Sequence, residues 1–80
     1  MSKELIDEVK SIGFDVVGKY ASVMLDDYFV DILFEKDKVK IRLSNFKGLK
    51  TTLCVFSNKI SRRDFANYLN RLIIVLSKED

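Results

Sequence analysis

The residues of this chain that could do chemistry are a group of aspartates and a single thiol. Asp26 and Asp27 adjoin, with Asp31 and Asp15 nearby in sequence, and carboxylate oxygens are ligands that Mg²⁺ prefers. Adjacent aspartates between two strands are more often turn formers, so we expect no metal there. Cys54 lies between two apolar residues and has no His to activate it, which predicts a buried, inert thiol. The sequence therefore predicts no enzyme: no catalytic residue, no metal, no cofactor and no small-molecule substrate.

The basic side chains could instead bind an anion. They gather in the second half of the chain around aromatic residues such as Phe46, and proteins that bind single-stranded nucleic acid combine cations with exposed aromatics for base stacking. Two arginines also open a predicted helix, where the helix dipole favours an anionic partner. The candidate residues for an anion or a nucleic acid are Lys38, Lys40, Arg42, Lys47, Lys50, Arg62 and Arg63.

Residues 28–43 predict how those charges are positioned, because this segment specifies its own pairing. With Lys36 and Asp37 as a two-residue loop, apolar pairs fall on one face of a hairpin and opposite charges on the other, which stabilises that register. Lys40 then faces Leu33 and has no acidic partner. The predicted pairs are Val30 with Leu43, Ile32 with Ile41 and Phe34 with Val39 on the apolar face, and Asp31 with Arg42 and Glu35 with Lys38 on the charged face.

Periodicity and cap residues predict the remaining elements. Ser2 can cap a first helix that Gly13 ends, and Ser61 is the predicted N-cap of a second helix. Gly18 suggests a bulge or a close approach within the first strand. We expect helices at about residues 3–12 and 62–77, and strands at about residues 15–25, 28–35, 38–44 and 51–57. The predicted fold is α+β, helix–four-stranded antiparallel meander–helix, in a single small domain over residues 1–80.

Two features of the predicted sheet stay open at this point. In the last strand, either Leu53 and Val55 or Cys54 and Phe56 face the core. The two helices could cover one face of the sheet each, or both could cover the same face. In the second case an apolar patch rimmed by charge would be left over, which is typical of a protein–protein interface. The interface candidates are Tyr20, Met24, Phe29 and Leu33, with Ile74 on the second helix as a weaker one.

Composition and charge complete the prediction. Residues 1–35 carry a net charge of −5 and residues 36–80 a net charge of +7. The two halves can attract each other within the fold, or the second half can form a basic binding surface. One cysteine and no apolar run long enough for a bilayer favour a soluble cytoplasmic protein without a membrane partner. We expect a small protein-interaction module (an adaptor, inhibitor or regulator) that forms a homodimer, with nucleic-acid binding as the alternative.

Overall fold

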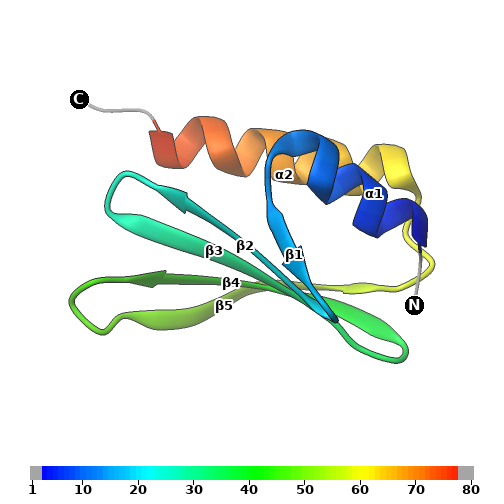
Figure 1. Ribbon diagram of the computed structural model, residues 1–80, viewed down its shortest axis with the longest axis horizontal. Helices are drawn as coiled ribbons and strands as arrows, with labels where there is room; N and C mark the ends of the chain where they lie inside the picture. The colour runs from blue at the N-terminus through cyan, green and yellow to red at the C-terminus, as the bar shows by residue number, and fades with distance from the viewer. Residues whose placement is uncertain (1–2, 78–80) are drawn as a thin grey trace.

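Two helices lie on one side of a five-stranded antiparallel sheet in the computed structural model, which describes residues 3–77 (Figure 1). The strands follow one another across the sheet in chain order, so the sheet is a meander. The elements are α1 (Lys3–Ile12), β1 (Asp15–Val17), β2 (Tyr20–Leu25), β3 (Tyr28–Phe34), β4 (Lys38–Asn45), β5 (Lys50–Ser57) and α2 (Arg62–Ser77). The α+β class and the order helix–sheet–helix are confirmed, whereas the number of strands is not.

The predicted strand over residues 15–25 is two strands in the structure. β1 ends at Val17, β2 begins at Tyr20, and the two pair antiparallel across a turn made by Gly18 and Lys19. Gly18 has a φ of 59°, a positive value like that which type II′ hairpin turns need at their first central residue and that glycine adopts without strain. The expectation of four strands is therefore wrong, because Gly18 reverses the chain rather than forming a bulge in one strand.

The predicted register of the central hairpins is confirmed. In the β3–β4 pair, Ile32 lies opposite Ile41 and Asp31 lies opposite Arg42. At the hairpin end the backbone N–H of Glu35 donates to the carbonyl of Lys38 at 2.9 Å. β2 and β3 also pair as expected, with their turn at Asp26 and Asp27. These registers follow from the pairing of neighbouring side chains. A slip of one residue would move each side chain of a strand to the opposite face of the sheet.

β5 adopts one of the two registers that the sequence left open. Cys54 lies opposite Ile41 and Phe56 opposite Val39, so Cys54 and Phe56 face the core. The pairing shifts by one residue between Ile41 and Arg42, which leaves Leu53 as the extra residue of a bulge.

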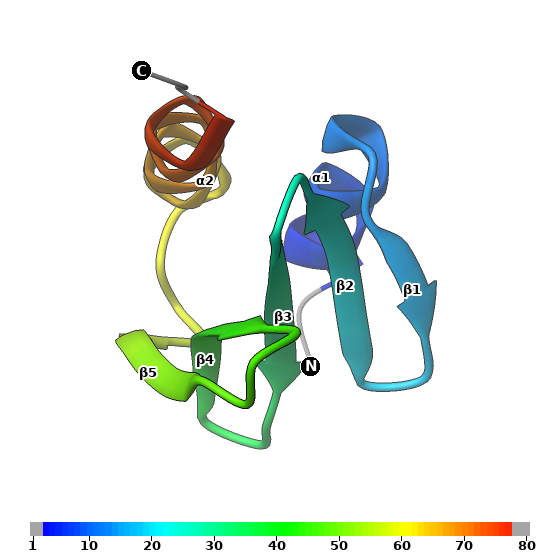
Figure 2. The same ribbon diagram turned by 90° about the vertical axis from the view of Figure 1, so that its left-hand side faces the viewer.

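Both helices pack on the same face of the sheet, as Figure 2 shows from the end of the molecule. α1 buries Leu5 and Val9, and α2 buries Phe65 and Leu69 against the inward-facing residues of the strands. The ring of Phe65 lies between those of Phe34 and Phe56, with centroid distances of 6.5 and 6.3 Å. Of the two arrangements that the sequence left open, the helices therefore adopt the one in which both cover the same face, and the outer face of the sheet is uncovered. The core residues are Leu5, Val9, Phe14, Ala21, Val30, Ile32, Phe34, Val39, Ile41, Phe65 and Leu69.

The helix ends are capped largely as predicted. After α1 the chain turns at Gly13, and the N–H of buried Phe14 donates to the carbonyl of Val9 at 2.9 Å. At the start of α2 the N–H of Asp64 donates to Oγ of Ser61 at 3.1 Å, which confirms this N-cap. The predicted cap at Ser2 lies outside the described residues. Within residues 3–77, neither helix combines the length and the apolar character that a membrane span requires.

Candidate functional site

The outer face of the sheet carries two apolar pairs separated by a polar row. Tyr20 lies opposite Leu33 near one end of the β2–β3 pair, and Met24 lies opposite Phe29 near the other. Tyr20 is 38% exposed and Met24 is 60% exposed, while Phe29 and Leu33 are half-buried. These four residues, the outer-face patch, are the interface residues that the sequence proposed on this face. They lie on the same face of two adjacent strands, as two pairs on either side of the polar row, and no helix covers them.

The polar row between the two pairs contains a buried charge. Asp31 is only 7% exposed although it lies on the uncovered face, with Ser22 opposite it on β2 and Arg42 opposite it on β4. Burial, then the hydrogen bond and the charge of Asp31, raise the pKa of the Tyr20 hydroxyl. The Nε of Arg42 is itself buried and has no hydrogen-bond partner in the structure. The polar row thus places Asp31 beside Tyr20 and opposite Arg42, between the two apolar pairs of the patch.

Phe46 extends the patch, which sequence reasoning missed. It lies in the β4–β5 turn and is 68% exposed. Its ring meets the ring of Phe29 edge-on, with the centroids 4.8 Å apart. Sequence reasoning considered Phe46 only as a stacking partner for nucleic-acid bases. The turn brings it to the outer face because Asn45 holds the loop, accepting hydrogen bonds on Oδ1 from the N–H groups of Lys47 and Leu49 at 3.0 Å each.

Acidic residues engage most of the candidate cations on β4. Glu35 lies within 3.7 Å of Nζ of Lys38 and within 3.8 Å of Nζ of Lys40. The expectation that Lys40 has no acidic partner is therefore wrong, because Glu35 at the strand end reaches both lysines. Arg42 lies opposite Asp31 in the polar row. The three cations of this stripe therefore exceed the two nearby acids, Glu35 and Asp31, by one positive charge.

The two arginines at the start of α2 are in different situations. Nε of Arg62 donates a hydrogen bond of 2.6 Å to Glu8 on α1, and this bond raises the pKa of Arg62. The unfavourable position of Arg62 at the positive end of α2 is therefore offset within the chain rather than by an anionic ligand. Arg63 is exposed and has no ion pair among residues 3–77, and the same holds for Lys47 and Lys50.

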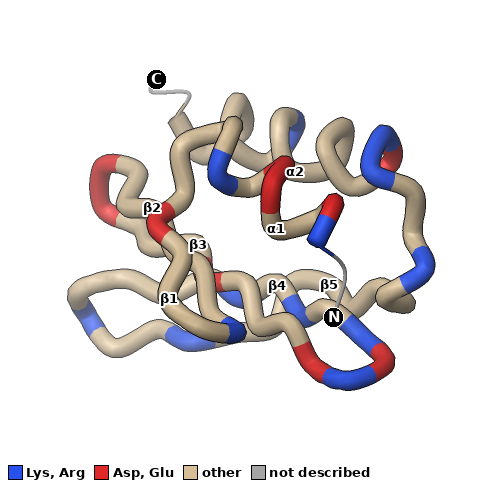
Figure 3. The backbone as a smooth tube through the Cα atoms, turned by 45° about the vertical axis from the view of Figure 1, so that its right-hand side comes forward, with Lys and Arg blue, Asp and Glu red and all other residues tan. Residues whose placement is uncertain are grey.

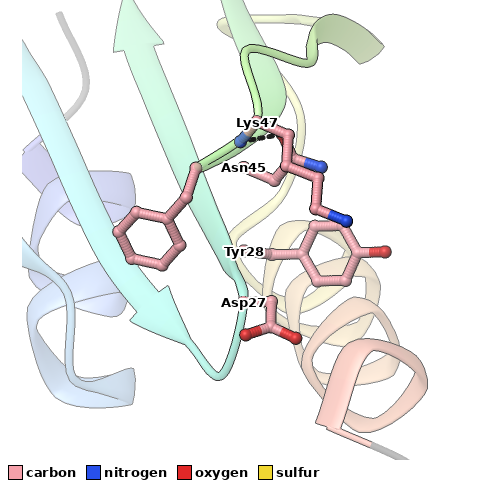
Figure 4. Close-up of a pocket in the computed structure, with 5 residues that line it drawn as sticks. Asp27, Tyr28, Asn45 and Lys47 are labelled. Atoms are coloured by element: carbon pink, nitrogen blue, oxygen red, sulfur yellow. Dashed lines mark hydrogen bonds between the residues drawn. The ribbon is translucent and has the colours of Figure 1, made fainter.

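A small hollow lies between the β2–β3 turn and the β4–β5 turn (Figure 4). It has a volume of about 260 Å³, and its lining includes Asp27, Tyr28, Asn45 and Lys47. The hollow is open, and Asn45 is already engaged in holding its own turn. No group of three or more His, Cys, Asp or Glu residues among residues 3–77 is arranged to hold a metal ion.

The two remaining candidates lie apart from the outer face. Ile74 is 65% exposed on α2, a helix that covers the opposite side of the sheet. Cys54 is half-buried on the inner side of β5, next to Tyr68, where burial and then Cys54 raise the pKa of the tyrosine hydroxyl. Cys54 is thus less buried than expected, because it lies on the edge strand.

Comparison with known proteins identifies no relative of this chain. No family model, no curated protein sequence and no solved structure matches the chain.

Proposed function

We propose that this protein is a non-catalytic protein-interaction module, an adaptor, inhibitor or regulator, that forms a homodimer through the outer-face patch. The observation that carries the proposal is the placement of both helices on one face, which leaves Tyr20, Met24, Phe29 and Leu33 uncovered. Exposed aromatic and Met side chains rimmed by polar residues are typical of interface centres. The single thiol favours a reducing cytoplasm as the site of this function.

The charges beside the patch support a second copy of the chain as the partner. Two identical faces can approach only if their charges do not repel. On β4, Glu35 pairs with both Lys38 and Lys40, and Asp31 lies opposite Arg42, so only one positive charge of the three is in excess. A dimer would also bury apolar area that an 80-residue chain cannot cover alone, which is a common way to stabilise so small a domain.

The test measures solution mass by light scattering over a wide concentration range, with circular dichroism as the measure of folding. We expect a dimer that Leu33→Asp and Met24→Asp each weaken by about 30-fold or more, because each places a charge in one of the two apolar pairs of the patch. Met24 is mostly exposed, so its replacement should leave the fold intact. The matched control is Ile74→Asp, which adds the same charge at a similarly exposed apolar residue on α2.

A wild-type protein that is monomeric at every concentration contradicts self-association. A dimer that Ile74→Asp dissociates and Met24→Asp leaves intact would move the interface to α2.

Binding of single-stranded nucleic acid is the second candidate function. It is favoured by the exposed ring of Phe46 in the same turn as Lys47, with Lys50 at the start of β5, since a ring beside free cations can stack a base while the cations contact phosphates. This site is smaller than the one predicted from sequence, because Lys38, Lys40, Arg42 and Arg62 have acidic neighbours.

A further inference from the structure

The open edge of β5 presents backbone groups that face away from β4, of which the carbonyl of Ser57 already accepts a hydrogen bond from the N–H of Ile60 at 3.1 Å. β5 is the last strand of the sheet, and the N–H of Asn58 donates to the carbonyl of Asp37 at 3.2 Å, just beyond the β4–β5 ladder. Hydrogen-bonded pairs alternate along antiparallel strands, so Phe56 also directs its backbone toward β4. The N–H groups of Val55 and Ser57 are then directed to the open edge.

Along residues 54–57 this edge lacks the features that usually prevent a further strand from pairing. Sheet edges are commonly protected by charged residues, by proline, by bulges or by a covering loop. Lys50 is the only charged residue of β5 and lies at its far end, and the strand contains no proline. The bulge at Leu53 precedes the segment 54–57, which pairs regularly with β4. An extended segment could therefore add to residues 54–57 as a sixth strand.

A groove between α2 and β5 adjoins this segment. Its volume is about 430 Å³, and Phe56 and Tyr68 form part of it with their rings edge-on and their centroids 5.1 Å apart. Figure 2 shows α2 above β5 at this end of the sheet. A strand added beside β5 would direct every second side chain toward α2, and so into this groove. The lining residues are Phe56, Ile60, Asp64, Asn67, Tyr68 and Arg71.

The charges around the groove are mainly positive. Arg71 belongs to the lining, and Lys59 and Arg63 adjoin the lining residues Ile60 and Asp64 in sequence. None of these three cations has an ion pair among residues 3–77. Asp64 is the one acid of the lining, so three cations stand against one acid around the groove. An occupant of complementary charge would therefore be acidic.

We propose that the groove and the β5 edge bind an extended acidic segment of a partner protein. The segment pairs through its backbone with residues 54–57 and inserts apolar side chains over Phe56 and Tyr68. Its acidic side chains lie near Arg71 and Lys59. This surface is on the helix side of the sheet, so it is separate from the outer-face patch and does not depend on the homodimer.

The probe is a synthetic peptide of about eight residues, a length typical of strands, with alternating Glu and Val. The matched control peptide has Lys in place of Glu. We expect the acidic peptide to bind the full-length protein in fluorescence anisotropy, with an affinity that falls as salt rises. We also expect it to slow hydrogen exchange at the N–H groups of Val55 and Ser57.

Two pairs of variants separate backbone pairing from charge. Val55→Pro removes an N–H directed to the open edge and should abolish binding, whereas Val55→Thr keeps it and should bind as the wild type does. Arg71→Glu should weaken binding by about tenfold. Lys19→Glu makes the same change of charge in the β1–β2 turn, at the opposite edge of the sheet, and should leave binding unchanged.

Three results would overturn the proposal. The first is that neither peptide binds, and the second is that the basic peptide binds as tightly as the acidic one. The third is that a folded Val55→Pro variant binds as tightly as Val55→Thr. If Val55→Pro instead dissociates a wild-type dimer that Met24→Asp leaves intact, a second copy of the chain occupies the edge and the acidic segment does not.

Discussion

On the outer face, apolar side chains flank a carboxyl group that is nearly removed from water. Asp31 retains 7% exposure in a face that no helix covers, because its neighbours on β2 and β4 close around it. Removing a carboxylate from water is costly unless a cation and hydrogen bonds compensate. The hydroxyl of Tyr20 supplies one such hydrogen bond, and Arg42 lies opposite Asp31 on β4, which ties the polar row to the patch.

The pH dependence of stability should report this contact. The pKa of Tyr20 is raised above its ordinary value of about 10, chiefly by burial and then by the hydrogen bond to Asp31. A raised pKa means that the folded state holds the proton more tightly, so the contribution to stability is complete below pH 10 and is lost as pH rises above it. Urea unfolding at a series of pH values between 8 and 11 should show a shallower alkaline decline for Tyr20→Phe than for the wild type.

An equal decline in the two proteins would contradict this assignment. Tyr68 also has a raised pKa, caused first by burial and then by Cys54, so the Tyr20→Phe variant should keep part of the decline.

At the scale of elements, one glycine decides which side chains of the first strands face outward. The turn at Gly18 reverses the chain, so Val16 lies opposite Ala21 on the core side and Val17 lies opposite Tyr20 on the outer side. A single strand through residues 15–25 would have directed Val17 to the core instead, since side chains alternate along a strand. The turn therefore adds Val17, which is exposed, to the outer face beside the patch.

Substitution of Gly18 should be costly through the backbone alone. Nothing lies within 4 Å of a Cβ added at this residue, so no clash is expected, but its φ of 59° is strained for other L-residues. Gly18→Ala should lower the free energy of unfolding by about 1 kcal/mol, and Gly18→Asn by less, because Asn tolerates this region better. Chemical denaturation of the two variants measures the difference. Equal stability of Gly18→Ala and the wild type would show that the turn relaxes to a negative φ.

At the scale of the whole molecule, the acidic and basic halves of the sequence largely offset each other. Figure 3 shows acidic residues on α1 and the β2–β3 turn, and basic residues along the β4–β5 turn and at the start of α2. The halves meet where Arg62 binds Glu8 and where Glu35 contacts Lys38 and Lys40. The asymmetry of the sequence therefore leaves a smaller free basic surface than its net charges suggest.

The salt dependence of nucleic-acid binding should reflect this reduction. If a labelled single-stranded oligonucleotide contacts Lys47, Lys50 and one further free cation, the slope of log K against log salt should be about −2. Lys47→Glu should weaken the binding, and Lys40→Glu should weaken it less because Glu35 already offsets Lys40. Fluorescence anisotropy at several salt concentrations measures both. A slope much steeper than this would mean that the cations on β4 leave their acidic partners to contact phosphate.

The sequence by itself determined the elements whose stabilising contacts are local. The register of β3 against β4 follows from opposed charges and apolar pairs across a two-residue loop, and the N-cap at Ser61 follows from a hydrogen bond within one turn. At Gly18 the sequence predicted a bulge or a close approach and not the turn, because a glycine within an apolar run does not distinguish them.

The tertiary structure alone decided which face of the sheet the helices cover, and with it the candidate site. Apolar residues lie on both faces of β2 and β3, so alternation along the strands cannot say which face is buried. Aromatic packing of Phe65 against Phe34 and Phe56 draws α2 to the inner face, where α1 joins it. The same long-range contacts fix the register of β5, and they leave both the outer-face patch and the β5 edge open to partners.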